Sequence, residues 1–171
     1  MALETHDLVI TTGGVSVGDY DIMGDLVREK TGEMLFNKVT MRPGSVTTAA
    51  VRGGKLLLAL SGNPGACFVG FQLFARPVIS LMLGAAQPLL PEWTAVMGAD
   101  YSKVNNYTRF VRARLEILDG SIYAYPAGID ESSVMVTIKD SDCLIIVPPE
   151  ARGLTAGDRV RILKLPGEVL G

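Results

Sequence analysis

The sequence LVITTGGVSVGDYD, residues 8–21, places a short apolar run directly before a turn that holds three glycines and two acids. Leu8 to Ile10 predicts a buried strand that ends at a tight turn. Residues 20–30 carry apolar side chains at helical spacing and predict a helix. Glycines let the backbone approach a ligand closely, and N–H groups at a helix start favour an anion. Two interpretations stay open, a plain strand-to-helix turn or a loop that holds a charged ligand, with the candidate contacts Gly13, Gly14, Ser16 and Gly18.

Two carboxylates stand where this loop enters the predicted helix, Asp19 and Asp21. They can cap the helix and interact favourably with its dipole. They can also hold a metal, because Mg²⁺ commonly bridges one or two carboxylates and the phosphates of a substrate. The spacing alone does not separate these two interpretations.

A second turn of the same kind follows the predicted strand 55–60, which forms a hairpin with residues 46–51. Ser61-Gly62-Asn63-Pro64 leads into an apolar helix that reaches Leu83 and that Pro77 should kink. Two such turns at the carboxyl ends of strands in one sheet would point at one crevice. Gln72 and Arg76 within the apolar run favour a core helix over a membrane span.

Residues 34–41 alternate and predict a strand that Arg42-Pro43-Gly44 ends. Lys38 and Arg42 are four residues apart, and an even separation would place both on one strand face. There they could flank an oxyanion. Solvated surface charge is the equally open alternative.

The pattern changes at Gly84. We expect a partial α/β domain at 1–84, a proline-containing linker at 85–92 and a small all-β domain, a barrel or sandwich, at 93–171. Short alternating runs predict strands in the second domain at 93–99, 108–118, 122–126, 132–138, 143–147 and 159–165. Arg112 and Arg114 would share a strand face and Arg109 would point oppositely, either as ligand contacts or as charges that keep an edge soluble.

Composition excludes several classes of function. The net charge of −2 gives no basic patch of the kind that binds nucleic acid or an anionic membrane. Cys67 and Cys143 lack any CxxC context and are interpreted as buried core residues. A single histidine, His6, argues against a histidine metal site or a Ser-His-Asp triad. The sequence shows no signal peptide, so we expect a cytoplasmic protein.

Three motifs together carry a family resemblance. TGGVSVGDYD (12–21), KVTMRPG (38–44) and LSGNP (60–64), with the apolar helix that contains Arg76-Pro77, resemble the carboxyl half of the MoeA family. These are molybdopterin molybdenumtransferases, and the carboxyl-terminal domain of gephyrin belongs to them. The resemblance implies a partial MoaB/MogA-like α/β domain followed by a β-barrel. It implies insertion of molybdate into adenylyl-molybdopterin with Mg²⁺, with release of molybdenum cofactor and AMP.

The resemblance also implies roles for individual residues. Asp21 matches the functional acid after the glycine loop and would help hold Mg²⁺ or molybdate, while Lys38 and Arg42 match the two basic positions that balance the anionic charge. Gly62, Asn63 and Pro64 match the second turn, although Ser61 stands where the family has proline. In the barrel, Arg112 resembles a functional arginine and Ser132 a serine of a Gln-Gly-Ser turn, here Asp130-Glu131-Ser132.

The family's amino-terminal domains and the start of its α/β domain have no counterpart in these 171 residues. Because the family site is built across a homodimer, we expect this chain alone to be inactive or severely impaired. A MogA-like adenylyltransferase is a candidate partner. Two alternatives remain: a MoaB/MogA-like adenylyl-transfer role, which the trailing β-domain disfavours, and a non-catalytic molybdopterin-binding or scaffold module.

Overall fold

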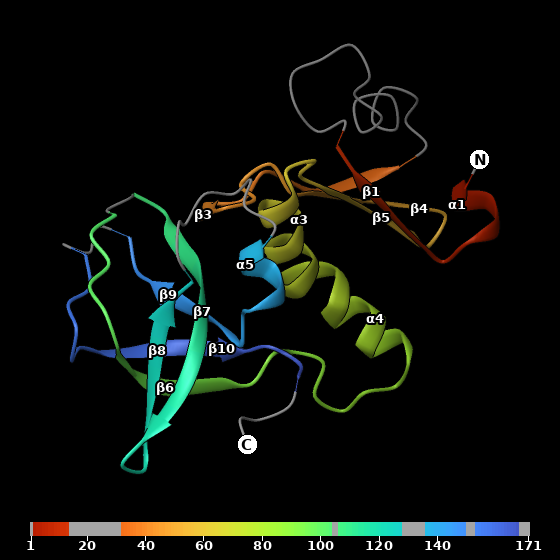
Figure 1. The fold of residues 1–171 in the computed structure, drawn as a ribbon. Coiled ribbons are helices and arrows are strands. Elements are labelled where there is room, and N and C mark those ends of the chain that lie inside the picture. Colours follow the sequence, from red (N-terminus) through yellow and green to blue (C-terminus); the bar gives the residue numbers. More distant parts are fainter. Residues whose placement is uncertain (1, 14–31, 104–105, 128–135, 150–152, 168–171) are drawn as a thin grey trace. The chain divides into compact units, whose positions relative to one another are not determined.

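The computed structural model (Figure 1) describes residues 2–13, 32–103, 106–127, 136–149 and 153–167. The chain divides into two compact units. The first comprises Met1–Thr40 and Gly44–Pro88, and the second comprises Met41–Pro43 and Leu89–Gly171. The helix predicted at 20–30 lies outside the described residues.

A four-stranded sheet forms the centre of the first unit. Its strands are β1 (Leu8–Thr12), β5 (Lys55–Leu60), β4 (Thr48–Arg52) and β2 (Glu33–Asn37), in that order across the sheet. The strand at 8–10 and the hairpin are therefore confirmed. β1 runs parallel to β5, whereas β5 with β4 and β4 with β2 are antiparallel. Gly53 and Gly54 make the hairpin turn with positive φ at both positions, the geometry of a two-residue turn whose twist matches the strands.

The apolar helix packs on one face of this sheet. It consists of α3 (Pro64–Gly70), a π-helical turn (Phe71–Ala75) and α4 (Arg76–Met82). Phe71 and Ala75 contact Ala49 and Leu58 of the sheet. Short α1 (Ala2–Thr5) places Leu3 in a second cluster, with Ala50, Leu57 and Ala59. A proline inside a helix lacks the N–H that would continue the hydrogen-bond pattern. Here a π-helical turn lies just before Pro77, and in it the Arg76 N–H donates to the Phe71 carbonyl oxygen five residues earlier.

The same helix is long and apolar enough, over Pro64–Met82, to cross a membrane by length and composition. The core helix of a soluble protein meets that criterion too. About a third of this span is buried in the described structure. The contacts with Ala49 and Leu58 agree with the predicted packing in a core, whereas Leu81, Met82 and Leu83 at its end are exposed.

The second unit is a closed five-stranded barrel, which confirms the predicted small all-β barrel. β7 (Thr108–Leu118) pairs with β8 (Ser121–Pro126), β8 with β6 (Glu92–Met97), β6 with β10 (Arg159–Lys164), β10 with β9 (Cys143–Val147), and β9 with β7. A two-residue strand, β3 (Met41–Arg42), pairs parallel to the start of β7. Inward-facing side chains such as Val111, Ala113, Leu115 and Ile145 fill the barrel.

One predicted strand of this unit, residues 132–138, is wrong over its described part. Residues 132–135 lie outside the described residues, and Val136–Lys139 is a short helix, α5. The run from Val134 to Ile138 is apolar at nearly every position, and such a run does not distinguish a strand from a helical turn. The remaining predicted runs coincide with β6, β7, β8, β9 and β10.

The two cysteines are free thiols in different environments. Cys143 is fully buried in the barrel, as predicted, whereas Cys67 is only half-buried. Burial, reinforced by the nearby Asp142 carboxylate and opposed by Lys164, raises the pKa of the Cys143 thiol to about 12. The thiol is therefore neutral and unreactive at physiological pH.

We expect Cys143 to weaken the barrel at alkaline pH. The folded protein keeps the thiol proton to a higher pH than the unfolded chain, whose thiol titrates near 9. Its contribution to stability is therefore complete below pH 9 and declines by roughly 1 kcal/mol per pH unit above that. Urea unfolding at pH 8, 9 and 10 should show a steeper decline for the natural chain than for Cys143→Ala. Parallel declines would contradict this expectation.

Candidate functional site

The two glycine turns meet at one end of the four-stranded sheet. Thr12 ends β1 beside Leu60, which ends the parallel neighbour β5. The Gly13 N–H then donates to the Leu60 carbonyl oxygen at 3.0 Å, with φ +86° at Gly13. A methyl group on Gly62 would lie 3.2 Å from the Gly13 Cα, so the two backbones touch. Gly13 and Gly62 therefore lie together at one edge of the sheet, and the rest of the first turn lies outside the described residues.

Asn63 begins the helix at this edge. Its backbone is extended, and its Oδ1 accepts a hydrogen bond from the Ala66 N–H at 3.3 Å, which is the geometry of a helix N-cap. Pro64 occupies the first turn, where its missing N–H costs nothing. The Asn63 N–H donates to the Ser61 Oγ at 3.3 Å. The turn therefore places the N-terminus of a long helix at this end of the sheet. The partial positive charge of a helix N-terminus favours an anion.

Lys38 lies at the same end of the sheet. β2 ends at Asn37, whose register partner Thr48 begins β4 and is itself paired with Ala59 of β5. The Thr48 Oγ1 donates to the Asn37 Oδ1 at 3.2 Å, and the Lys38 N–H donates to the Thr47 carbonyl oxygen at 3.2 Å. The Lys38 side chain is exposed. The chain thus brings a lysine to the sheet end where the glycine turns meet.

The prediction that Lys38 and Arg42 share one strand is wrong. Lys38 has φ +71°, a left-handed backbone that ends β2, and the Val39 N–H turns back to the Ser45 carbonyl oxygen at 2.9 Å. Arg42 lies on the separate strand β3, which pairs with β7 in the other unit. Alternation in the sequence could not show this break, because a lysine with positive φ has no signature of its own.

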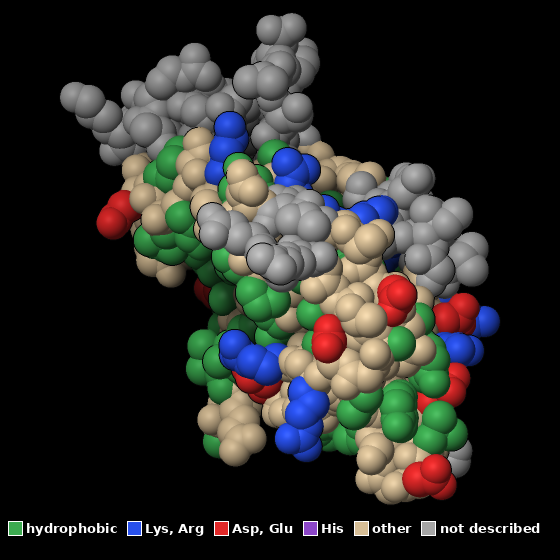
Figure 2. All heavy atoms as spheres, turned by 90° about the vertical axis from the view of Figure 1, so that its left-hand side faces the viewer, with side chains coloured by type: hydrophobic (Ala, Val, Ile, Leu, Met, Phe, Trp, Pro, Cys, Tyr) green, Lys and Arg blue, Asp and Glu red, His purple; other side chains and the backbone are tan. Residues whose placement is uncertain are grey.

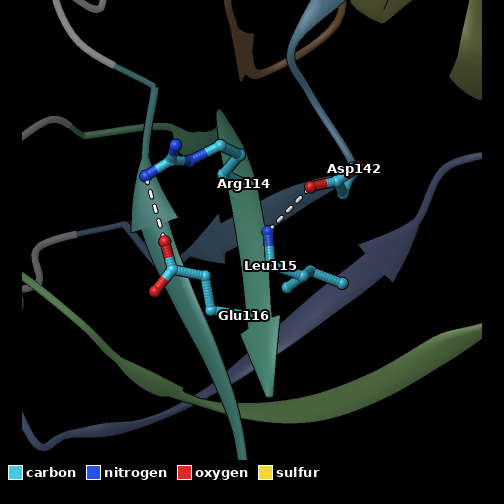
Figure 3. Close-up of polar contacts among 4 residues, drawn as sticks. All are labelled: Arg114, Leu115, Glu116 and Asp142. Atoms are coloured by element: carbon cyan, nitrogen blue, oxygen red, sulfur yellow. Dashed lines mark hydrogen bonds and ion pairs between the residues drawn. The ribbon is translucent and has the colours of Figure 1, made fainter. Parts of the chain in front are cut away.

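The barrel arginines differ in burial. Arg112 is only 4 % exposed, although it points away from the barrel interior lined by Val111 and Ala113. A buried guanidinium needs compensating polar or ionic contacts, so the surface-charge alternative does not fit Arg112. Arg114 is exposed and forms an ion pair with Glu116 at 3.1 Å (Figure 3). That pair is expected to add little stability.

Other predicted site residues fall outside the described part of the chain, namely Gly14, Ser16, Gly18, Asp21 and Ser132. Within the described ranges, no place gathers three or more His, Cys, Asp or Glu side chains. On the face shown in Figure 2, described Lys and Arg side chains are interspersed with acidic and apolar ones. This mixed surface agrees with the net charge of −2.

Fold and site together define a class of protein: an α/β unit with a glycine-lined sheet end, followed by a five-stranded barrel. Two family models match the chain in that order. "Probable molybdopterin binding domain" matches residues 1–81, and "MoeA C-terminal region (domain IV)" matches residues 94–165. The chain belongs to the MoeA family, as the sequence motifs indicate, and corresponds to its carboxyl-terminal part.

Similar proteins are longer than this chain. Molybdopterin molybdenumtransferases of Staphylococcus aureus (strain Mu50) and Staphylococcus epidermidis are 44% and 41% identical over 162 residues, which is 95% of this chain. The chain spans 39% of the length of these relatives. A solved MoeA structure from Pyrococcus horikoshii has a TM-score of 0.75 at 24% identity, over 98% of this chain and 39% of that one. A molybdenum cofactor biosynthesis protein from Pyrococcus furiosus has a TM-score of 0.66 at 24% identity, over 96% and 51%. These structural likenesses support the fold.

Proposed function

We propose that this chain is the carboxyl-terminal part of a molybdopterin molybdenumtransferase, which inserts molybdate into adenylyl-molybdopterin. One observation carries the proposal: the backbones of Gly13 and Gly62 touch at the sheet end that also presents Lys38. The absence of a side chain at Gly62 lets the two turns pack against each other at this end, and backbone N–H groups in turns of this kind can bind an anion. Lysine next to such a cradle is the usual point charge for a phosphate.

The roles that follow are electrostatic. The two glycine turns, with Gly14, Ser16, Gly18, Asn63 and Pro64 as candidate contacts, would hold a phosphate or the pterin. Lys38, and Arg42 from β3, would balance charge on molybdate and on the pyrophosphate-like bridge. Fixed positive groups aimed at developing negative charge are a large source of rate enhancement. Arg112 and Ser132 remain proposed substrate contacts on the strength of the family resemblance alone.

Asp21, which lies outside the described residues, is the carboxylate that would hold Mg²⁺ in this proposal. The ion ordinarily takes one or two carboxylates and completes its shell with water and substrate phosphates. Asn37 and Thr48 already place oxygen atoms at that end. When bound, Mg²⁺ would neutralise charge on the phosphates and molybdate. We further propose a cytoplasmic homodimer that receives its substrate from a MogA-like adenylyltransferase.

Lys38→Met tests the site. Titration of the whole chain with adenylyl-molybdopterin should show about tenfold or weaker affinity in this variant, since a hydrogen bond between charged groups contributes roughly 1.5–3 kcal/mol. Lys55→Met is the matched control. Lys55 begins β5, at the opposite end of the same sheet, and its Nζ donates to the Glu4 carbonyl oxygen at 2.9 Å.

Equal losses in the two variants would show that general charge, rather than the glycine-lined end, attracts the ligand. Unchanged affinity in Lys38→Met would contradict the proposed site. If the natural chain binds no adduct at any concentration and self-associates instead, the scaffold alternative replaces the transferase. Turnover of molybdate by the isolated chain would overturn the expectation that it is inactive alone.

A further inference from the structure

Two arginines lie side by side at the start of β7. In the parallel pairing of β3 with β7, Arg42 is the register partner of Arg109, as Met41 is of Thr108. Register partners on neighbouring strands project from the same face of a sheet. The two guanidinium groups are therefore attached to adjacent backbone positions on one face of the barrel unit.

A tyrosine borders this pair. The Arg42 Cζ lies 5.6 Å from the centre of the Tyr107 ring, within the range of a cation–π contact. Tyr107 precedes Arg109 by two residues, so both are expected on the same face of the chain. Arg42 and Tyr107 are exposed, so solvent reaches this cluster.

Of the two arginine side chains, that of Arg109 is the more buried. Its other register partner is Val147, which is buried in the barrel core, so Arg109 projects on the core-facing side where β7 begins. The residue is half-buried, and its Nε is shielded from solvent. A guanidinium held in this way has lost much of its rotamer freedom before any ligand binds, which lowers the entropic cost of binding.

We propose that Arg42 and Arg109, with Tyr107 as a supporting ring, form a binding site for a tetrahedral oxydianion. Two positive side chains at directly opposed positions of a sheet together present a concentrated positive charge to an anion. Two guanidinium forks match the oxygen geometry of phosphate and of molybdate. This deepens the proposed function and rests on it for the source of the anion, a phosphoryl group of the substrate or molybdate itself. Arg109 is thereby given a binding role of its own.

The experiment uses inorganic anions and the whole ¹⁵N-labelled chain. Sodium phosphate and sodium molybdate are titrated separately at constant ionic strength, with sodium chloride as the reference. The Nε–Hε resonances of Arg42 and Arg109 should shift and saturate, whereas that of Arg114 should not. The anion with the lower dissociation constant identifies the source.

Variants locate the site. Arg109→Gln should weaken anion binding about tenfold, and Arg109→Lys, which keeps the charge but loses the fork, should weaken it less. Arg114→Gln lies on the same strand outside the cluster and should bind as the natural chain does. Amide spectra of each variant verify the fold. Absent shifts, or equal affinity in Arg109→Gln and Arg114→Gln, would overturn the proposal.

The two proposals fail separately. If Lys38→Met weakens adduct binding while Arg109→Gln leaves phosphate and molybdate binding unchanged, the transferase site stands and the arginine site is wrong. If Arg109→Gln weakens anion binding while Lys38→Met leaves adduct binding intact, the arginine site stands and the glycine-lined site is wrong.

Discussion

Gly153→Ala is expected to destabilise the barrel unit by about 3 kcal/mol, a large share of the typical stability of a domain. Gly153 has φ +94°, a conformation that side chains rarely adopt, and a methyl group there would lie 2.8 Å from the Tyr101 carbonyl oxygen. That oxygen accepts a hydrogen bond from the Leu154 N–H at 2.8 Å, and the Tyr101 N–H donates to the Leu154 carbonyl oxygen at the same distance. These two bonds form an isolated β-bridge, which the backbone shift needed to relieve the clash would break.

Gly157→Ala is the matched control for this prediction. Its φ is +93°, almost identical, but no atom lies within 4 Å of the added methyl group. This variant should lose about 1 kcal/mol, which represents the backbone strain alone. Thermal unfolding should show a much larger drop in melting temperature for Gly153→Ala. Equal drops would mean that the contact with Tyr101 contributes nothing.

Asp142→Ala is expected to cost the barrel about 2 kcal/mol. β9 begins at Cys143, opposite Ala113, so the ladder between β7 and β9 does not extend to Leu115. The Asp142 Oδ2 takes the place of the missing strand and accepts the Leu115 N–H at 2.9 Å (Figure 3). Because Leu115 is buried, alanine at 142 would leave that N–H without its acceptor in a dry environment.

Asp142→Asn distinguishes the loss of this hydrogen bond from the loss of the carboxylate charge, because the asparagine amide oxygen can still accept the Leu115 N–H. We expect a loss of less than about 1 kcal/mol in urea unfolding. Amide hydrogen exchange gives the local readout: Leu115 should exchange faster in the alanine variant and remain protected in the asparagine variant. Similar stability and similar Leu115 exchange in the two variants would contradict the proposed capping of the strand.

Sequence patterns predicted the fold where alternation and turn chemistry agree. The hairpin around Gly53-Gly54 and the long strand β7 appear where predicted, because each combines a period of two with a strong turn signal. The helix at 136–139 was missed because an apolar run of five residues carries no period. The π-helical turn before Pro77 could not be predicted from the sequence pattern either, because it depends on how the helix accommodates one missing N–H.

The candidate site was only partly predictable for a similar reason. Repetition of strand, small-residue turn and helix correctly placed Gly13 and Gly62 together. The spacing of Lys38 and Arg42 was misleading, because a single left-handed residue ends one strand and the chain begins another in a different unit. The pairing of Arg42 with Arg109 depends on register between segments far apart in sequence, which no local pattern contains.

The short strand β3 has a consequence for how this protein can be divided. The chain leaves the first unit after Thr40 and contributes Met41–Pro43 to the barrel unit. It belongs to the first unit again from Gly44 to Pro88, and the rest of the chain belongs to the barrel unit. Expression of residues 89–171 alone would produce a barrel without the backbone partner of Thr108 and Arg109. A faithful dissection would supply the 41–43 segment in trans or graft it before β6. The two halves are thus interleaved along the gene, and neither is a freely exchangeable module.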